Sequence, residues 1–338
     1  MATQPPAGPP DPGLVFSEMQ LFQRSMAFKG ALELEIFTHI DGGTATAAEI
    51  ASRCGGSERG VRILCDYLTV SGHLSKQQGA YQLTPTSRVF LSKHSPAYLG
   101  SMAGFLMNGF QVAAFRDVAG AVRNGGALHN EALAPESPLW VDFARSMAPM
   151  AAMVGGAVAP LLIPQDGSPL QILDIAAGHG MYGIAMAQYN PHAEITGQDW
   201  SNVLDVAREN AARAGIAERY RTLPGSAFEV EFGGPYDLVL VPNFAHHFDP
   251  AAATEFFRKC RAALKPGGRI ALIEFVPDED RVSPPAQAAF ALTMLVGTPK
   301  GDAYTFSEYE SMLRDAGFRD WEMLAADKIP QRVIVAVA

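Results

Sequence analysis

The chain has 338 residues and a formal net charge of −9 at pH 7, and 48% of its residues are hydrophobic. This length predicts two domains, each with enough apolar side chains for its own core. The acidic balance argues against a general binder of nucleic acid or anionic membranes, because both partners attract a strongly positive surface. A small-molecule partner fits this composition better.

The N-terminal residues 1–13, MATQPPAGPPDPG, have no basic segment followed by an apolar one. We therefore expect a disordered Pro-rich tail rather than a signal peptide. The three cysteines, Cys54, Cys65 and Cys260, lie far apart in the sequence, so neither a disulfide framework nor a zinc knuckle is predicted. These features are typical of a cytoplasmic protein.

Three long stretches carry no Lys, Arg, Asp or Glu: residues 95–115, 146–165 and 282–299. The first two approach the roughly 20 residues that span a bilayer. However, amide side chains, glycines and prolines interrupt them, which favours helices buried within the protein over membrane spans.

Residues 14–96 are predicted to form a mainly helical domain. Its first helix is expected over residues 14–40, where apolar side chains lie around most of the circumference, so that the helix needs partners on several sides. Thr46 and Glu49 have the spacing of a capping box at the start of the next helix. Ser57 begins another helix, which ends at Gly72.

The segment from Leu74 to Leu83 is predicted to be a hairpin that turns at Gly79. Two helices followed by a hairpin are typical of a winged helix. Residues 44–95 contain six basic and three acidic side chains, whereas a DNA-binding domain usually has a dense basic stripe. We therefore favour a structural or dimerising role for this domain over DNA binding.

Residues 97–165 are expected to form two or three long apolar helices that link the domains. From residue 166 onward, short β-rich runs alternate with helical stretches, which predicts a parallel sheet with helices on both faces. The predicted strands include QILDIA, EITGQ, YDLVLV, RIALIEF and RVIVAVA, and the predicted helices cover residues 180–189, 202–214, 252–264 and 306–316.

The strongest local signal is the segment DIAAGHG, residues 174–180, in which a buried strand runs into a glycine-containing turn and then a helix. Gly178 and Gly180 allow the backbone to approach a ligand closely, and the helix N-terminus offers free amides. Ala176 occupies the first glycine position of a dinucleotide GxGxxG motif, so the segment is not that motif.

Asp199 lies 25 residues beyond Asp174, where the second strand of the sheet should end. A carboxylate there is suited to bind the two vicinal hydroxyls of a ribose. A helix N-cap is the alternative role, for which Ser201 competes.

Two further segments follow predicted strands at the same edge of the sheet. Residues 225–228, GSAF, put Phe228 where an adenine ring could stack, although ordinary core packing is equally compatible. Residues 242–249, PNFAHHFD, lie in the crevice where doubly wound sheets bind their ligands.

In this order the segments DIAAGHG, Asp199, GSAF, PNFAHHF, LKPGGR and the final RVIVAVA resemble the class I S-adenosylmethionine-dependent methyltransferases. With the winged helix, residues 14–338 resemble the dimeric small-molecule O-methyltransferases of the plant caffeic-acid and bacterial polyketide and antibiotic type. The resemblance implies a Rossmann-like doubly wound sheet of seven strands, the last antiparallel, over residues 166–338. It also implies S-adenosylmethionine as cofactor and an intertwined homodimer through the N-terminal winged helix.

The candidate cofactor residues are Asp174, Ala176, Gly178, Gly180, Asp199, Trp200, Ser226, Ala227, Phe228 and Asn243. In the resembled family a histidine followed by Asp and an aromatic residue is the catalytic base. That motif falls on His246, with His247 in the Asp position, and the acid that orients the base falls on Glu274. A second flanking acid is replaced by Ala303, for which Asp302 is the possible substitute.

Several alternatives remain open for these residues. His246 and His247 could cap a helix or line the crevice, and Glu274 could be an ordinary strand-end carboxylate. Adjacent histidines can also bind a metal, but Asp249 alone is thin support, so no metal is predicted.

The uncharged stretches are expected to build an apolar acceptor pocket, with core packing as the alternative for each residue. Its candidate residues are Phe105, Phe110, Met147, Met150, Phe290 and Met294. They indicate an aromatic or polyketide-like acceptor that is methylated on a hydroxyl. Carbon methylation, another S-adenosylmethionine-assisted reaction and a winged-helix sensor without catalysis are the alternatives.

Overall fold

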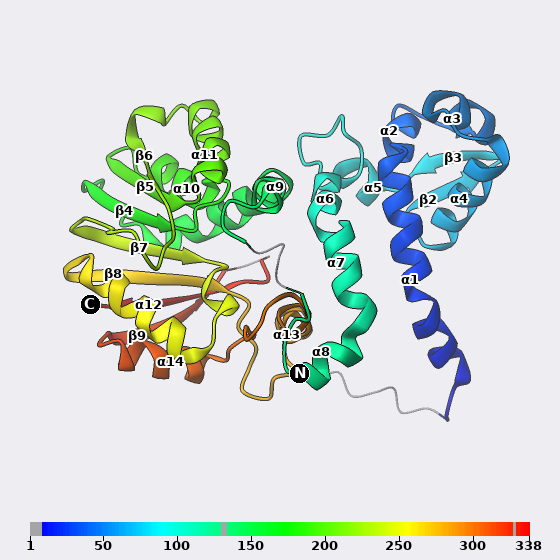
Figure 1. The fold of residues 1–338 in the computed structure, drawn as a ribbon. Helices are drawn as coiled ribbons and strands as arrows, with labels where there is room; N and C mark the ends of the chain where they lie inside the picture. The colour runs from blue at the N-terminus through cyan, green and yellow to red at the C-terminus, as the bar shows by residue number, and fades with distance from the viewer. Residues whose placement is uncertain (1–8, 130–133, 327–328) are drawn as a thin grey trace. The chain divides into compact units, whose positions relative to one another are not determined.

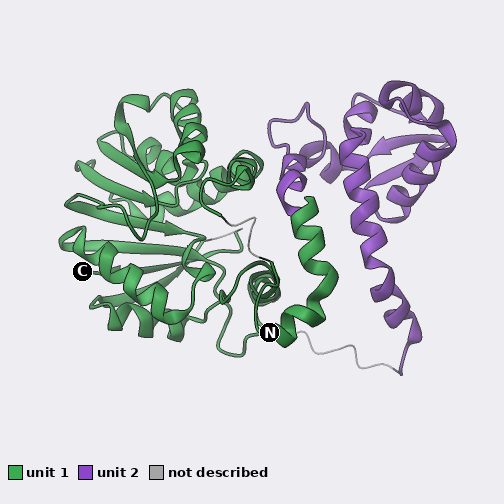
Figure 2. Cartoon of the chain, viewed as in Figure 1, with its two compact units in different colours: residues 1–3, 108–338 green, residues 4–107 purple. Residues whose placement is uncertain are grey.

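The computed structural model describes residues 9–129, 134–326 and 329–338. The first eight residues of the expected tail lie outside this description. The described chain folds into two compact units, one up to Met107 and the other from Asn108 onward (Figure 2). No helix in these ranges combines the length and the apolar character needed to cross a membrane.

The N-terminal unit begins with two helices, α1 (Pro12–Glu33) and α2 (Ile36–Ile40), and not with the single helix predicted over residues 14–40. The helix is interrupted at Glu35, which adopts a left-handed φ of 52°. This interruption changes the direction of the backbone, and the side chains of Ile36 and Phe37 are buried in the core of the unit. Burial of these side chains therefore outweighs continuation of the helix.

The winged-helix pattern is confirmed. α3 (Ala47–Cys54) begins with the predicted capping box, α4 (Glu58–Val70) is capped by Ser57, and the hairpin of β2 (Leu74–Gln77) and β3 (Ala80–Leu83) turns through Gly79 at φ 82°. The remaining elements of this unit are β1 (Ala45–Thr46), α5 (Pro85–Phe90), η1 (Gly100–Met102) and α6 (Ala103–Leu106).

The prediction of two or three long helices over residues 97–165 is wrong for most of the described part of that region, from which residues 130–133 are excluded. Asn108 and Asp117 each accept a hydrogen bond from a backbone N–H three residues on and so start new helices, which keeps the helical segments short. Among the described residues of this region, only α9 (Pro138–Leu162) forms a long helix. The short elements of the second unit are α7 (Gly109–Ala114), η2 (Phe115–Asp117) and α8 (Val118–Asn124).

The second unit contains a seven-stranded sheet with the order β6-β5-β4-β7-β8-β10-β9, in which β10 is antiparallel to both of its neighbours (Figure 1). This confirms the predicted doubly wound fold. The strands are β4 (Leu170–Ile175), β5 (Ala193–Asp199), β6 (Tyr220–Pro224), β7 (Tyr236–Pro242), β8 (Leu264–Glu274), β9 (Arg319–Ala325) and β10 (Arg332–Val337).

Helices cover both faces of this sheet, and successive strand residues alternate between the two layers. On β7, for example, Leu238 and Leu240 pack with α9, α10 (Met181–Tyr189) and α11 (Ser201–Arg213), whereas Val239 and Val241 pack with α12 (Pro250–Ala262) and α14 (Phe306–Asp315). The remaining helices are η4 (Ala217–Arg219), η5 (Ala245–His247) and α13 (Pro285–Gly297).

Strand β9 was not among the predicted strands. It is an edge strand whose residues, RDWEMLA, are mostly exposed, so they lack the apolar alternation that marks a half-buried strand. Its pairing with β10 defines it as a strand. The carboxyl ends of β4, β5, β7 and β8 lie side by side at one edge of the sheet, and the chain order reverses between β4 and β7. Such a reversal is where open sheets bind ligands.

Candidate active site

The turn after β4 has three residues with positive φ: Ala176 at 47°, Gly178 at 57° and Gly180 at 74°. A Cβ on Gly180 would lie 2.8 Å from the hydroxyl of Tyr220, so this glycine permits close packing of the turn. A Cβ on Gly178 would meet only the Ala176 carbonyl, at 3.7 Å. Gly178 therefore leaves open space over the backbone where a ligand could approach.

Asp199 ends β5 and is tied to this turn. Its carboxylate accepts hydrogen bonds from the Gly178 N–H at 2.8 Å and the Trp200 N–H at 2.7 Å. Burial raises the pKa of Asp199 to about 6. No side chain caps α11, so the N-cap role considered for Asp199 does not describe it, and its remaining lone pairs are free for hydroxyl donors.

Asp174 and Asn243 each bury a side-chain oxygen that has no hydrogen-bond partner among the described residues. Asp174 accepts from the Gly183 N–H at 3.0 Å with Oδ2, but its Oδ1 is unpaired. Asn243 donates to the Tyr182 hydroxyl at 2.9 Å, whereas its Oδ1 is unpaired. Burial raises the pKa of Asp174 to about 8. Unpaired buried acceptors are costly, so these two oxygens fit a site for a ligand with ammonium or hydroxyl donors.

The turn after β6 presents Phe228, whose side chain is 43% exposed. Its ring packs edge to face against Phe248, with centroids 4.9 Å apart, while part of the ring stays open. The neighbouring Ala227 is buried, and its carbonyl accepts from Lys259 Nζ at 3.0 Å. The Ser226 carbonyl accepts from the N–H of Glu229, which closes the turn. Phe228 thus combines core packing with an open face.

His246 and Glu274 form a buried pair between the ends of β7 and β8. His246 Nδ1 lies 2.5 Å from Glu274 Oε2, and the other carboxylate oxygen accepts from the backbone N–H groups of Phe244 and Ala245 at 3.0 and 2.9 Å. The Glu274 side chain is fully buried and that of His246 is 5% exposed. The carboxylate, held by two amides, therefore faces Nδ1, and Nε2 is the ring nitrogen that does not face it.

His247 has a different environment. Its Nδ1 lies 3.1 Å from the Phe244 carbonyl, and burial together with the neighbouring His246 lowers its pKa to about 3. The two imidazole rings are 4.4 Å apart. His247 is therefore a neutral hydrogen-bonding group with Nε2 as acceptor, and the carboxylate partner belongs to His246.

The candidate acceptor-pocket residues are spread over several elements. The ring of Phe290, on α13, lies 4.8 Å from that of His246 and stacks on Phe275 at 4.3 Å. Met294 and Met147 are buried, and Met150 packs against the core on the α9 side of the sheet. Phe110 lies on α7, which packs against α13, and Phe105 belongs to the other unit. Of these residues, Phe290 is the one whose described contacts include His246.

Sequence reasoning missed an aromatic row beside the turn. The rings of Trp140 and His247, Trp140 and Phe143, and Phe143 and His179 form successive pairs with centroids 6.4 Å apart. Trp140 and Phe143 lie three residues apart on α9, a spacing that helical periodicity could have revealed. Burial lowers the pKa of His179 to about 4, so this ring is neutral.

Asp302, the possible second flanking acid, has another partner. Its carboxylate is paired with Arg281 at 3.2 Å, and Ala303 beside it is buried. Within the described ranges, no group of three or more His, Cys, Asp or Glu side chains is arranged to hold a metal ion. Asp249 caps α12 and pairs with Lys300.

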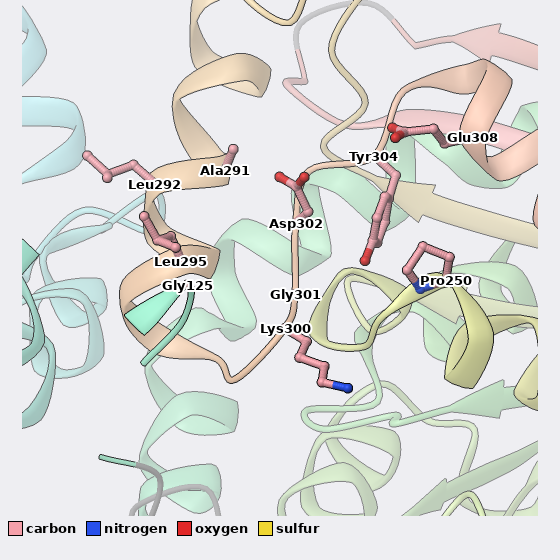
Figure 3. Close-up of a pocket in the computed structure, with 10 residues that line it drawn as sticks. All are labelled: Gly125, Pro250, Ala291, Leu292, Leu295, Lys300, Gly301, Asp302, Tyr304 and Glu308. Carbon is pink, nitrogen blue, oxygen red and sulfur yellow. The ribbon is translucent and has the colours of Figure 1, made fainter. Parts of the chain in front are cut away.

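A cavity of about 630 Å³ is bordered by α13 and by the segment from Lys300 to Tyr304. In Figure 3 that segment runs between Ala291 and Leu295 on one side and Pro250 on the other. None of the candidate cofactor residues lines the cavity, which is distinct from the open space at Gly178.

Fold and site together define an S-adenosylmethionine-dependent methyltransferase. Residues 141–319 match the O-methyltransferase domain and residues 16–93 the O-methyltransferase dimerisation domain. The chain therefore belongs to the O-methyltransferase family, its methyl donor is S-adenosylmethionine, and its winged helix is a dimerisation domain.

Known proteins are similar over nearly the whole chain. A crystal structure from Nostoc punctiforme assigned as an O-methyltransferase is 46% identical, with a TM-score of 0.94 over 98% of this chain and 100% of that one. The 3-hydroxy-5-methyl-1-naphthoate 3-O-methyltransferase of Streptomyces sahachiroi is 27% identical over 87% of this chain and 86% of its own length. The L-tyrosine C(3)-methyltransferase of Streptomyces lavendulae is 26% identical over 93% and 91%.

Proposed function

We propose that this enzyme methylates a phenolic hydroxyl of an aromatic or polyketide-like small molecule, with His246 as general base. The buried pair of His246 and Glu274 carries the proposal, because a carboxylate that holds Nδ1–H leaves Nε2 able to take the phenol proton. The family name supports transfer to an oxygen, and the naphthoate relative supports an aromatic acceptor.

When bound, S-adenosylmethionine supplies an electrophilic methyl group on a positively charged sulfur. Asp199 would hold the ribose hydroxyls, and the unpaired Oδ1 atoms of Asp174 and Asn243 would accept hydrogen bonds from donor groups of the cofactor. Phe290 and the aromatic row would exclude water from the acceptor. Holding the acceptor oxygen in line is itself a large part of the rate enhancement.

The direct test is a mass-spectrometric screen of phenols, naphthols and polyketide aromatics with methyl-labelled S-adenosylmethionine. We expect a labelled product whose methyl group is bonded to oxygen, as two-dimensional NMR would show. A methyl group bonded to a ring carbon would favour the second candidate, carbon methylation, which the relation to the tyrosine C(3)-methyltransferase makes the specific alternative.

Replacement of Asp199 by alanine should weaken S-adenosylmethionine binding by about 1.5 to 3 kcal/mol, because hydrogen bonds to a charged acceptor are lost. Titration calorimetry of the folded variant measures the change. Asp205→Ala, which removes an exposed carboxylate on the neighbouring α11, is the matched control and should bind normally. An Asp199 variant with unchanged affinity would locate the ribose site elsewhere.

The same carboxylate should make cofactor binding depend on pH. Burial raises the pKa of Asp199 in the free enzyme to about 6, and hydroxyl donors favour the ionised form. Below pH 6 binding must therefore release a proton, and this group alone should weaken affinity by up to about tenfold per pH unit. Calorimetry between pH 5 and pH 7 in buffers of different ionisation enthalpy would detect the proton. Proton release that is the same in Asp199→Asn would assign it to another group.

We also propose a homodimer formed through the dimerisation domain. The apolar side chains of α1 include Phe16, Met19 and Phe22, which are 64 to 66% exposed in the single chain. Such a surface is typical of a partner interface. Light scattering should give twice the chain mass of 36.1 kDa. The double variant Phe16→Asp with Phe22→Asp should shift the protein toward the monomer. The control variant Gln188→Asp, on α10, should stay dimeric. A monomeric wild type at micromolar concentration would refute the proposal.

A further inference from the structure

The turn formed by residues 300–302, which we call the backing turn, contacts the segment that carries His246. The Asp302 N–H donates to the His246 carbonyl at 3.0 Å. A Cβ on Gly301 would lie only 2.3 Å from the same carbonyl oxygen, so the turn packs directly against the backbone of the proposed base. Both of these approaches are to the backbone of His246.

Ion pairs hold both ends of the backing turn. Lys300 Nζ lies 3.0 Å from Asp249 Oδ2, three residues after His246, and Arg281 binds Asp302 at 3.2 Å. The second guanidinium nitrogen of Arg281 lies 2.5 Å from Glu308, at the start of α14. Arg281 therefore joins the turn to the first turn of a helix that packs against the sheet.

The backing turn is not buried: Lys300 is exposed, and Gly301 and Asp302 are half-buried. Lys300, Gly301 and Asp302 all border the cavity of about 630 Å³, so part of their surface faces open space (Figure 3). Inside the turn, the Gly301 N–H donates to the Thr298 hydroxyl at 2.8 Å, which ties it to the end of α13. Hydrogen bonds and ion pairs thus contribute to the position of the turn.

We propose that the backing turn, anchored by Arg281, positions His246 for proton abstraction. Arg281 and Asp302 are positioning residues, since they act through the backbone of His246 and not on the acceptor. The Asp302 carboxylate pairs with Arg281, whereas Glu274 is the acid that contacts the His246 ring. The inference rests on the proposed role of His246 as base.

Two substitutions disturb the turn by independent routes. Gly301→Ala introduces a steric conflict with the His246 carbonyl, and Arg281→Gln removes the anchor. Because small displacements of a catalytic group cost up to about 100-fold, each should lower kcat by roughly 10- to 100-fold with cofactor affinity unchanged. Arg281→Lys, which keeps one charged contact, should lose less than Arg281→Gln.

Matched controls are available close by. In Gly297→Ala, at the end of α13, the added Cβ meets no atom within 4 Å. Arg314→Gln removes the exposed ion pair between Arg314 and Glu310 on α14. Both should keep wild-type turnover. A loss in the test variants that is matched by the controls would indicate general destabilisation and overturn the positioning role.

The decisive measurement combines each change with His246→Ala, using saturating cofactor and acceptor. If the turn acts through His246, Gly301→Ala and Arg281→Gln should cost nothing further in the variant that lacks the imidazole. The inference would be overturned if the fold-loss in kcat of each turn variant multiplied with that of His246→Ala. Wild-type kcat in the single turn variants would overturn it as well. Neither outcome would contradict the role of His246 as base. Wild-type turnover in His246→Ala alone would instead refute the proposed base, and the inference with it.

Discussion

Replacing His246 by alanine should lower turnover of a phenolic acceptor by about 10² to 10⁴, the usual contribution of a positioned general base. The imidazole is fixed by Glu274 at 2.5 Å and lies in ring contact with Phe290. Single-turnover rates below the pKa of the acceptor measure the loss. Cofactor affinity, followed by calorimetry, should stay unchanged.

His247→Ala is the internal control for this prediction. Because burial and His246 lower the pKa of His247 to about 3, its imidazole is a weak base, and the variant should lose less activity. Near wild-type turnover in His246→Ala would mean that proximity and alignment drive transfer without a base. An acceptor that ionises by itself, or a carbon nucleophile, would then be the better interpretation.

Replacing Glu274 by glutamine should lower turnover by roughly 10²- to 10³-fold, because the imidazole would adopt the wrong tautomer. The analogous replacement of the aspartate by its amide in a serine-protease triad lowers kcat by about 10⁴-fold. The amide oxygen can still accept from the N–H groups of Phe244 and Ala245. Its NH₂ group then faces His246 Nδ1, which must accept, so the proton moves to Nε2 and blocks the base.

Two measurements separate this effect from a loss of stability. The melting temperature of Glu274→Gln should change little, because both backbone hydrogen bonds are retained, and Glu255→Gln on the exposed face of α12 provides the matched control. The lost activity should return at a pH above the pKa of the acceptor, where no base is needed. A rate deficit that is constant across that range would contradict the tautomer mechanism.

Much of the fold follows from local features of the sequence. The capping box of Thr46 and Glu49, the Ser57 cap and the Gly79 turn each depend on residues close in sequence, and each was predicted correctly. The alternation of buried strands and amphipathic helices likewise specified the doubly wound sheet, because each period places its apolar residues on one face. Features without such a local signal, such as the break at Glu35 and the polar edge strand β9, were missed.

The sequence also determined where the candidate cofactor residues lie along the chain, since the glycine turn and Asp199 both follow predicted strands. Whether two such residues touch is decided only by packing. Asp199 reaches back to the Gly178 N–H because β4 and β5 are neighbours in register. The pKa values of Asp174 and Asp199 depend in the same way on burial, which is a property of the assembled core.

Tertiary packing also decided which of the two adjacent histidines contacts a carboxylate. Both follow β7, and the residues alone left their roles open, although the family resemblance favoured His246. In the folded chain β7 and β8 are parallel neighbours, so Glu274, 28 residues away, meets His246, while His247 turns to the Phe244 carbonyl. The partner of Asp302, Arg281, is likewise set by packing. Local chemistry in the sequence therefore determined which groups are present at the strand ends, whereas side-chain packing between distant segments decided which of them act together.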